Sequence, residues 1–117
     1  MKENAIREKS FEFALRIVKL SKHLMDEKRE FVISKQLIRC GTAIGALVRE
    51  AEQAESKKDF IHKLSISLKE ANEAEYWLEL LHMSAYLSEK EFASVSSDLK
   101  QLLRLLTAII KTSKVKS

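Results

Sequence analysis

Core-type residues recur without interruption through the middle of the chain. From residue 60 to residue 85 they alternate spacings of four and three, which is the period of a left-handed helical bundle or coiled coil. These positions are Phe60, Leu64, Ser67, Ala71, Ala74, Leu78, Leu81 and Ala85. The pattern predicts a long amphipathic helix whose apolar stripe packs against other helices.

The rest of the chain favours the same architecture. The 117 residues include no proline and only two glycines, and 32% of them are charged, so the residues that usually mark turns are scarce. Apolar residues that recur every three or four positions predict helices over about 5–27, 32–54, 57–87 and 89–112. Short connections favour antiparallel neighbours. We therefore predict an all-α, antiparallel up-down-up-down four-helix bundle that forms one domain of residues 1–117.

Capping residues place the predicted helix starts. Asn4 is the candidate N-cap of the first helix. Ser56 and Asp59 are expected to begin the third helix, through the serine oxygen and a negative charge in the first turn. Ser88 and Glu91 form an S-x-x-E capping box before the fourth helix, which we expect to fray after residue 111.

Gly41 and Gly45 lie one turn apart within the second predicted helix, where each costs about 1 kcal/mol relative to alanine. One interpretation is close helix packing, in which the glycines face the small residues Ser67, Ala71 and Ala74. The other is a bare patch of backbone that admits a ligand. The absence of convergent polar groups nearby in the pattern favours close packing.

No motif in the sequence predicts catalysis or a metal site. Glu79-x-x-His82 and Asp59-x-x-His62 imitate ligand pairs of di-iron bundles, but both fall on one helix, whereas such sites draw ligands from several. Cys40, the only cysteine, sits in an apolar stripe and is expected to be a small core residue. We predict a protein that is not an enzyme, has no cofactor or metal, is cytoplasmic and does not span a membrane.

Large apolar residues also occupy the outer face predicted for the third helix. Aromatic residues and methionine are enriched at interface centres, so an exposed cluster of this kind indicates self-association. The alternative is that a wide core or the N-terminal segment covers them. The candidate oligomer-interface residues are Tyr76, Trp77, Leu80, Met83 and Leu87.

Positive charge is concentrated at the two ends of the chain. Residues 1–29 carry a net +3, residues 30–99 a net −4, and residues 100–117 five basic and no acidic residues. We expect the first and fourth helices to be neighbours, so that their basic stripes merge into a surface that binds a phosphate backbone. An ordinary solvated helix face is an equally strong interpretation. The candidate nucleic-acid-binding residues are Lys2, Lys9, Arg16, Lys100, Arg104, Lys111 and Lys114.

Several short motifs resemble a known family. They are G-T-x-I-G-A at 41–46, Glu50-Ala51, Ser56-x-x-Asp59-Phe60, Lys69-Glu70-Ala71 and Glu75-Tyr76-Trp77-Leu78. Together they resemble the bacterial four-helix-bundle proteins encoded by intervening sequences in large-subunit ribosomal RNA genes. That family is related to the accessory variability determinant of diversity-generating retroelements.

The resemblance implies a homopentameric bundle with no catalytic activity of its own. For the retroelement branch it also implies a basic surface that binds nucleic acid, RNA or DNA, and a companion reverse transcriptase. Ala43 and Leu47 depart from the serine and asparagine common in the family, so a polar role at these two positions is not expected here.

These observations lead to two functional hypotheses. The first is a homo-oligomeric bundle that binds RNA, or an RNA–protein complex, through the first and fourth helices. The second is a protein-interaction module without nucleic-acid binding that uses the apolar outer face of the third helix.

Overall fold

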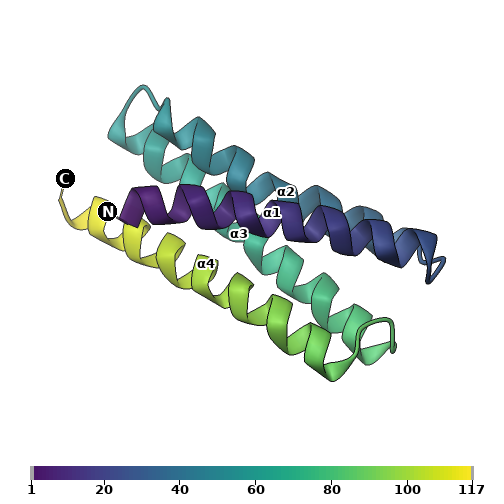
Figure 1. Cartoon of the computed structure of the whole chain (residues 1–117). Helices are drawn as coiled ribbons and strands as arrows, with labels where there is room; N and C mark the ends of the chain where they lie inside the picture. The colour runs from purple at the N-terminus through teal and green to yellow at the C-terminus, as the bar shows by residue number, and fades with distance from the viewer. Residues whose placement is uncertain (1, 117) are drawn as a thin grey trace.

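The computed structural model describes residues 2–116, with side chains from residue 4 onward. Four helices make up the fold: α1 (Lys2–Asp26), α2 (Val32–Glu52), α3 (Lys57–Met83) and α4 (Glu89–Val115). They run alternately up and down the long axis of a body with extents of 48 × 22 × 19 Å (Figure 1). The predicted all-α four-helix bundle is therefore confirmed.

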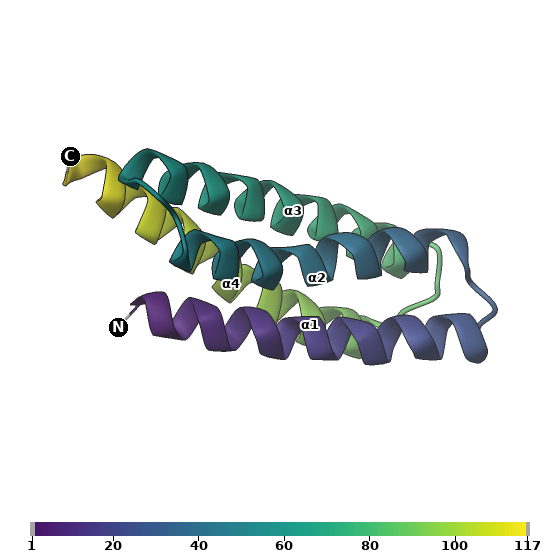
Figure 2. The same cartoon turned by 90° about the horizontal axis from the view of Figure 1, so that it is seen from above.

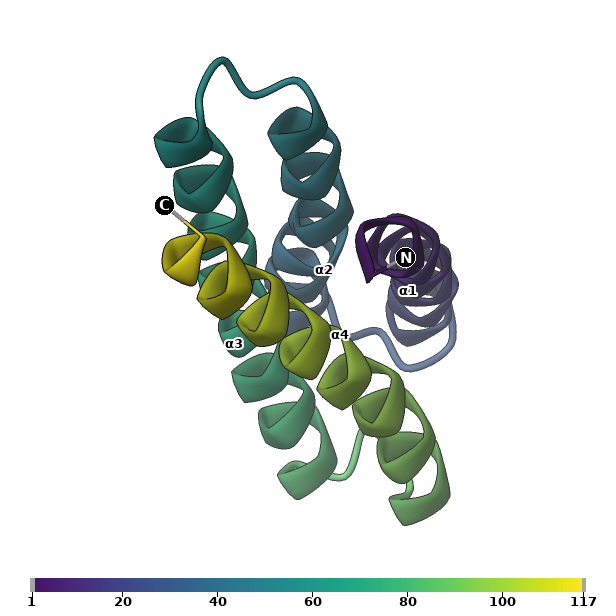
Figure 3. The same ribbon diagram turned by 90° about the vertical axis from the view of Figure 1, so that its left-hand side faces the viewer.

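Each helix packs on the one before it, and α1 and α4 close the bundle with the least extensive of the four contacts. Seen from above, α2 and α3 form a hairpin with α1 lying along α2 (Figure 2). Seen from its end, the bundle is splayed, because α4 crosses α3 obliquely while α1 stands beside α2 (Figure 3). One continuous apolar core runs between the helices and includes Phe13, Ile17, Leu37, Ile44, Leu64, Leu78, Leu99 and Leu106.

The predicted caps of α3 and α4 are confirmed. Ser56 Oγ accepts the Asp59 N–H at 3.0 Å. Ser88 Oγ accepts the Glu91 N–H at 3.1 Å, and the Glu91 carboxylate accepts the Ser88 N–H at 2.9 Å, which completes the box. This backbone hydrogen bond, followed by the one with the Ser88 side chain, lowers the pKa of Glu91.

The start of α2 is capped by a residue that the sequence pattern did not identify. Glu30 is 7% exposed as a residue. Its carboxylate accepts hydrogen bonds from the N–H groups of Val32, Ile33 and Ser34 at 3.1, 3.0 and 2.7 Å, and also from the Ser34 hydroxyl. Burial alone would raise the pKa of Glu30, but these hydrogen bonds lower it. A buried negative charge at this helix start also suits the helix dipole.

Four predicted helix ends were wrong. Helix α2 ends at Glu52 and not at residue 54. Asn4 lies inside α1, which already includes residue 2, so Asn4 is not its N-cap. Helix α3 ends at Met83 and not at residue 87, because the chain turns at Ala85, whose φ is +69°. Helix α4 does not fray after residue 111 but continues to Val115.

The glycines of α2 face α1, and not the small residues of α3. A Cβ on Gly41 would lie 2.9 Å from Ile17 Cγ2, and one on Gly45 would lie 3.3 Å from the Ser10 carbonyl oxygen. The predicted partners Ser67, Ala71 and Ala74 are buried, and Ser67 contacts α2 through a hydrogen bond that its Oγ donates to the Ile44 carbonyl at 2.9 Å. Small residues thus bring α2 close to both neighbours, with glycines on one side and Ser67 on the other.

Candidate nucleic-acid interface

Basic side chains line the outer face of α4. The core residues Val95, Leu99, Leu102, Leu106 and Ile109 occupy its inner face at helical spacing. Lys100, Arg104 and Lys111 lie on the opposite side and are exposed. We call these three residues the α4 basic stripe. Lys114, one turn further on, is exposed as well.

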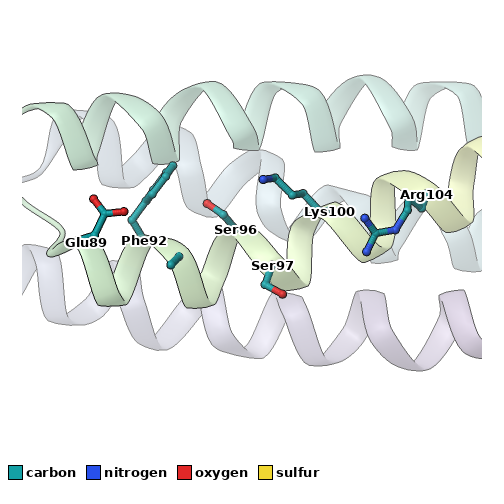
Figure 4. Close-up of a pocket in the computed structure, with 7 residues that line it drawn as sticks. Glu89, Phe92, Ser96, Ser97, Lys100 and Arg104 are labelled. Carbon is teal, nitrogen blue, oxygen red and sulfur yellow. The ribbon is translucent and has the colours of Figure 1, made fainter.

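A shallow open depression of about 410 Å³ lies along the N-terminal half of α4. Its walls combine two cations, two hydroxyls and one aromatic ring: Lys100, Arg104, Ser96, Ser97 and Phe92 (Figure 4). Glu89 closes the end furthest from Arg104. Cationic and hydroxyl groups on one exposed surface are the donors that contact phosphate oxygens in nucleic-acid complexes.

Within residues 4–116, no carboxylate pairs with Lys100, Arg104 or Lys111. The nearest acid along the depression, Glu89, is engaged elsewhere, because one of its oxygens lies 2.9 Å from His82 Nε2. The imidazole of His82 also stacks on Phe92 at 4.3 Å between centroids. The positive charge of the α4 basic stripe is therefore not neutralised by the bundle's own ion pairs.

The basic residues of α1 have a different environment. Arg16 donates to Asp98 at 2.7 Å and to the Ser94 hydroxyl at 2.7 Å, so it joins α1 to α4. Lys9 is exposed beside a small cavity of about 60 Å³ that Glu12 and Asp98 also line. The side chain of Lys2 lies outside the described residues. The expectation that the two stripes merge into one free basic face was wrong at Arg16, whose charge is already paired.

The outer face of α3 agrees in part with the predicted oligomer interface. Tyr76, Leu80 and Met83 are exposed. Trp77 is half-buried against the core and donates from its indole to Glu73 at 2.9 Å; this hydrogen bond and the ion pair with Arg39 lower the pKa of Glu73. Leu87 was wrongly assigned to this face: it is 3% exposed, because the turn after Met83 returns it to the core.

Sequence reasoning missed a second exposed apolar stripe. Phe11, Leu15 and Val18 on α1 are 49%, 48% and 43% exposed. Their spacing of four and three residues was a signal available in the sequence. The inward stripe of Phe13 and Ile17 accounted for α1 packing without them, so their separate helical face was not recognised.

Cys40, the only cysteine in the sequence, lies in the core. Cys40 is fully buried, and burial raises the pKa of its thiol to about 12, so the reactive thiolate is scarce at neutral pH.

In the part of the chain described, no three His, Cys, Asp or Glu side chains gather as a metal site would require. None of the helices in residues 2–116 combines the length and apolar character needed to cross a membrane.

Within residues 4–116, the all-helical bundle carries the α4 basic stripe, whose charges are not paired there, and exposed apolar side chains on α1 and α3. The profile of the family described as 23S rRNA-intervening sequence protein matches residues 2–108. The chain therefore belongs to this family.

A solved structure agrees closely with the fold. It is a protein of unknown function from the S23 ribosomal protein family of Bacteroides thetaiotaomicron, 55% identical in sequence, with a TM-score of 0.94. The match covers 95% of this chain and 99% of that one. Comparison with curated proteins finds no match.

Proposed function

We propose that the protein is a non-enzymatic, homo-oligomeric bundle that binds RNA through the α4 basic stripe. The single observation that carries this proposal is the unpaired state of Lys100, Arg104 and Lys111 among the described residues, on a segment from 100 to 117 without an acidic residue. The family's association with 23S rRNA intervening sequences supports RNA as the nucleic acid.

Affinity in this proposal comes mainly from phosphate contacts. Binding releases condensed counterions, so three contacts to single-stranded RNA correspond to a slope of about −2 in log K against log salt. Affinity per chain then falls roughly 20-fold between about 50 and about 200 mM salt. Assembly of several chains multiplies the number of contacts and steepens this dependence.

The test is a titration of a labelled RNA hairpin and a labelled single-stranded RNA at two salt concentrations. We expect binding at low salt that weakens at high salt and is lost in Lys100→Glu/Arg104→Glu/Lys111→Glu. Lys58→Glu, an exposed reversal at the start of α3, is the matched control and should retain binding. Absence of binding at low salt, or equal binding by the triple variant, would contradict the proposal.

The assembly is proposed to be a pentamer, by resemblance to the family. One chain has a mass of 13.5 kDa, so light scattering of the purified protein distinguishes a monomer of that mass from an assembly about five times as heavy. A monomer in solution would end this part of the proposal. For the related retroelement accessory proteins, the resemblance implies a reverse transcriptase as partner, and a pull-down with a purified reverse transcriptase tests that extension separately.

A second candidate function is a protein-interaction module without RNA binding. The exposure of Tyr76 and Met83, at 58% and 80%, favours it. Leu80→Ser discriminates between the uses of that face. Dissociation of the assembly with the bundle still folded assigns the face to self-association, and an intact assembly leaves it available for another protein.

A further inference from the structure

We propose that the outer face of α1 and α2 is the docking site for the outer face of α3 in a second copy of this chain. This inference rests on the self-association in the proposed function and identifies the two surfaces that meet. One surface carries Phe11, Leu15 and Val18, and we call it the α1 apolar stripe. The other carries Tyr76, Leu80 and Met83, and we call it the α3 apolar stripe.

The α1 apolar stripe borders a groove that can receive side chains. An open, mainly apolar groove of about 260 Å³ lies between α1 and α2, and its lining includes Phe11, Ala14, Gly45 and Ala46. Among the described residues that line it, the one hydroxyl belongs to Thr42, which already donates to the Ile38 carbonyl at 2.7 Å. An apolar partner therefore leaves no hydroxyl donor unsatisfied in this groove.

The α3 apolar stripe has the matching form. Its three residues have the same spacing of four and three as those of the α1 apolar stripe, so both stripes extend over two turns of helix. The Tyr76 ring packs edge-on against Trp77 at 5.0 Å, and Trp77 is itself held by Glu73. This support orders an exposed aromatic residue before it docks, which reduces the entropy lost on binding.

Opposite charges stand beside the two stripes. Arg49 lies over the Phe11 ring, 5.2 Å from its centroid, and pairs with no carboxylate among the described residues. Glu79 lies on α3 three residues after Tyr76 and four before Met83. It is exposed and has no basic partner in residues 4–116. Docking the stripes side by side offers each charge a partner of opposite sign.

Two different complementary faces on one chain define a head-to-tail contact that every copy can repeat. A second copy is therefore the occupant that supplies both the apolar match and the opposite charge. Lys100, Arg104 and Lys111 belong to neither face. Assembly through these faces leaves the α4 basic stripe of each copy outside the contact.

The test is a charge exchange followed by light scattering and analytical ultracentrifugation of the full chain. Arg49→Glu and Glu79→Arg should each raise the dissociation constant of the assembly at least about tenfold, and the double variant should restore it by re-pairing the charges. Lys90→Glu, exposed at the start of α4, is the control for charge reversal alone. Circular dichroism establishes that each variant keeps its helices.

The outcomes separate the two levels of the proposal. An assembled wild type with both single variants unaffected overturns the docking of these faces but leaves self-association intact. Two disruptive single variants without rescue in the double variant overturn the pairing of the α1 and α3 faces, because they show independent contacts to other surfaces. A monomeric wild type overturns the self-association in the proposed function itself.

Discussion

Arg16 on α1 and Arg104 on α4 are both basic residues on the outer helices of the bundle, yet their surroundings differ. Arg16 reaches across to Asp98 and Ser94 and holds α1 to α4. Arg104 stands with Lys100 beside an open depression, without an acidic partner among the described residues. Arg16 is therefore already engaged in an ion pair between two helices, whereas Arg104 remains available for a ligand.

Substitution of Glu30 should give the largest change in stability, because its charge serves the fold alone. In Glu30→Ala the N–H groups of Val32, Ile33 and Ser34 lose their acceptor, and we expect a loss of about 2 kcal/mol in the free energy of unfolding. Urea denaturation measures it. RNA affinity at low denaturant should stay unchanged. A parallel loss of affinity would contradict the separation between charges that act within the bundle, such as Glu30, and charges of the α4 basic stripe that bind RNA.

The same residue predicts a pH dependence of stability. The pKa of Glu30 in the folded protein lies below its ordinary value of 4.5. Its contribution is therefore complete above about pH 4.5 and is lost as the pH falls through the lower, folded-state pKa. Glu30→Gln should flatten this part of the profile relative to the wild type. An unchanged acid-denaturation profile in the variant would contradict the role of the carboxylate.

A smaller loss is expected when the contact between α1 and α2 is overpacked. The added Cβ of Gly41→Ala would meet Ile17 at 2.9 Å. Strain of about 1–3 kcal/mol is partly offset by the better helix propensity of alanine, so the net loss should be about 1 kcal/mol. Gly45→Ala, at 3.3 Å from Ser10, is the milder comparison. Thermal unfolding should give Gly41→Ala a lower Tm than Gly45→Ala.

Arg16→Ala should have the smallest effect. Both side chains of the Arg16–Asp98 pair are more than one-third exposed, and exposed pairs contribute less than about 1 kcal/mol. We expect a small fall in stability by urea titration and RNA affinity within about twofold of the wild type. A tenfold loss of affinity in this variant would place Arg16 in the RNA-binding surface after all.

Helical period and capping chemistry were enough to predict the four helices, their antiparallel order and the starts of α3 and α4. The neighbour of each face was not predictable, because spacing identifies a stripe without saying which helix covers it. Gly41 accordingly faces α1 rather than α3. Leu87 was misplaced because the chain turns at Ala85, a non-glycine residue with positive φ that carries no turn signal.

For the candidate interface, too, helical spacing predicted which residues share a face but not which residues they contact. The α4 basic stripe was visible as charge at helical spacing. The pairing of Arg16 with Asp98 was not, because the two residues are distant in sequence and meet only when the bundle closes. The α1 apolar stripe had the correct spacing but was passed over once a core stripe had been assigned to the helix.

The salt dependence of RNA binding tests the central claim most directly. In Lys100→Ala/Arg104→Ala/Lys111→Ala the slope of log K against log salt should become shallower by about 2 per bound chain. Each lost phosphate contact to a single strand removes roughly 0.7 from the magnitude of the slope. Lys9→Ala/Arg16→Ala should leave the slope near that of the wild type. Equal reductions in both variants, or a slope unchanged in the α4 variant, would contradict the account.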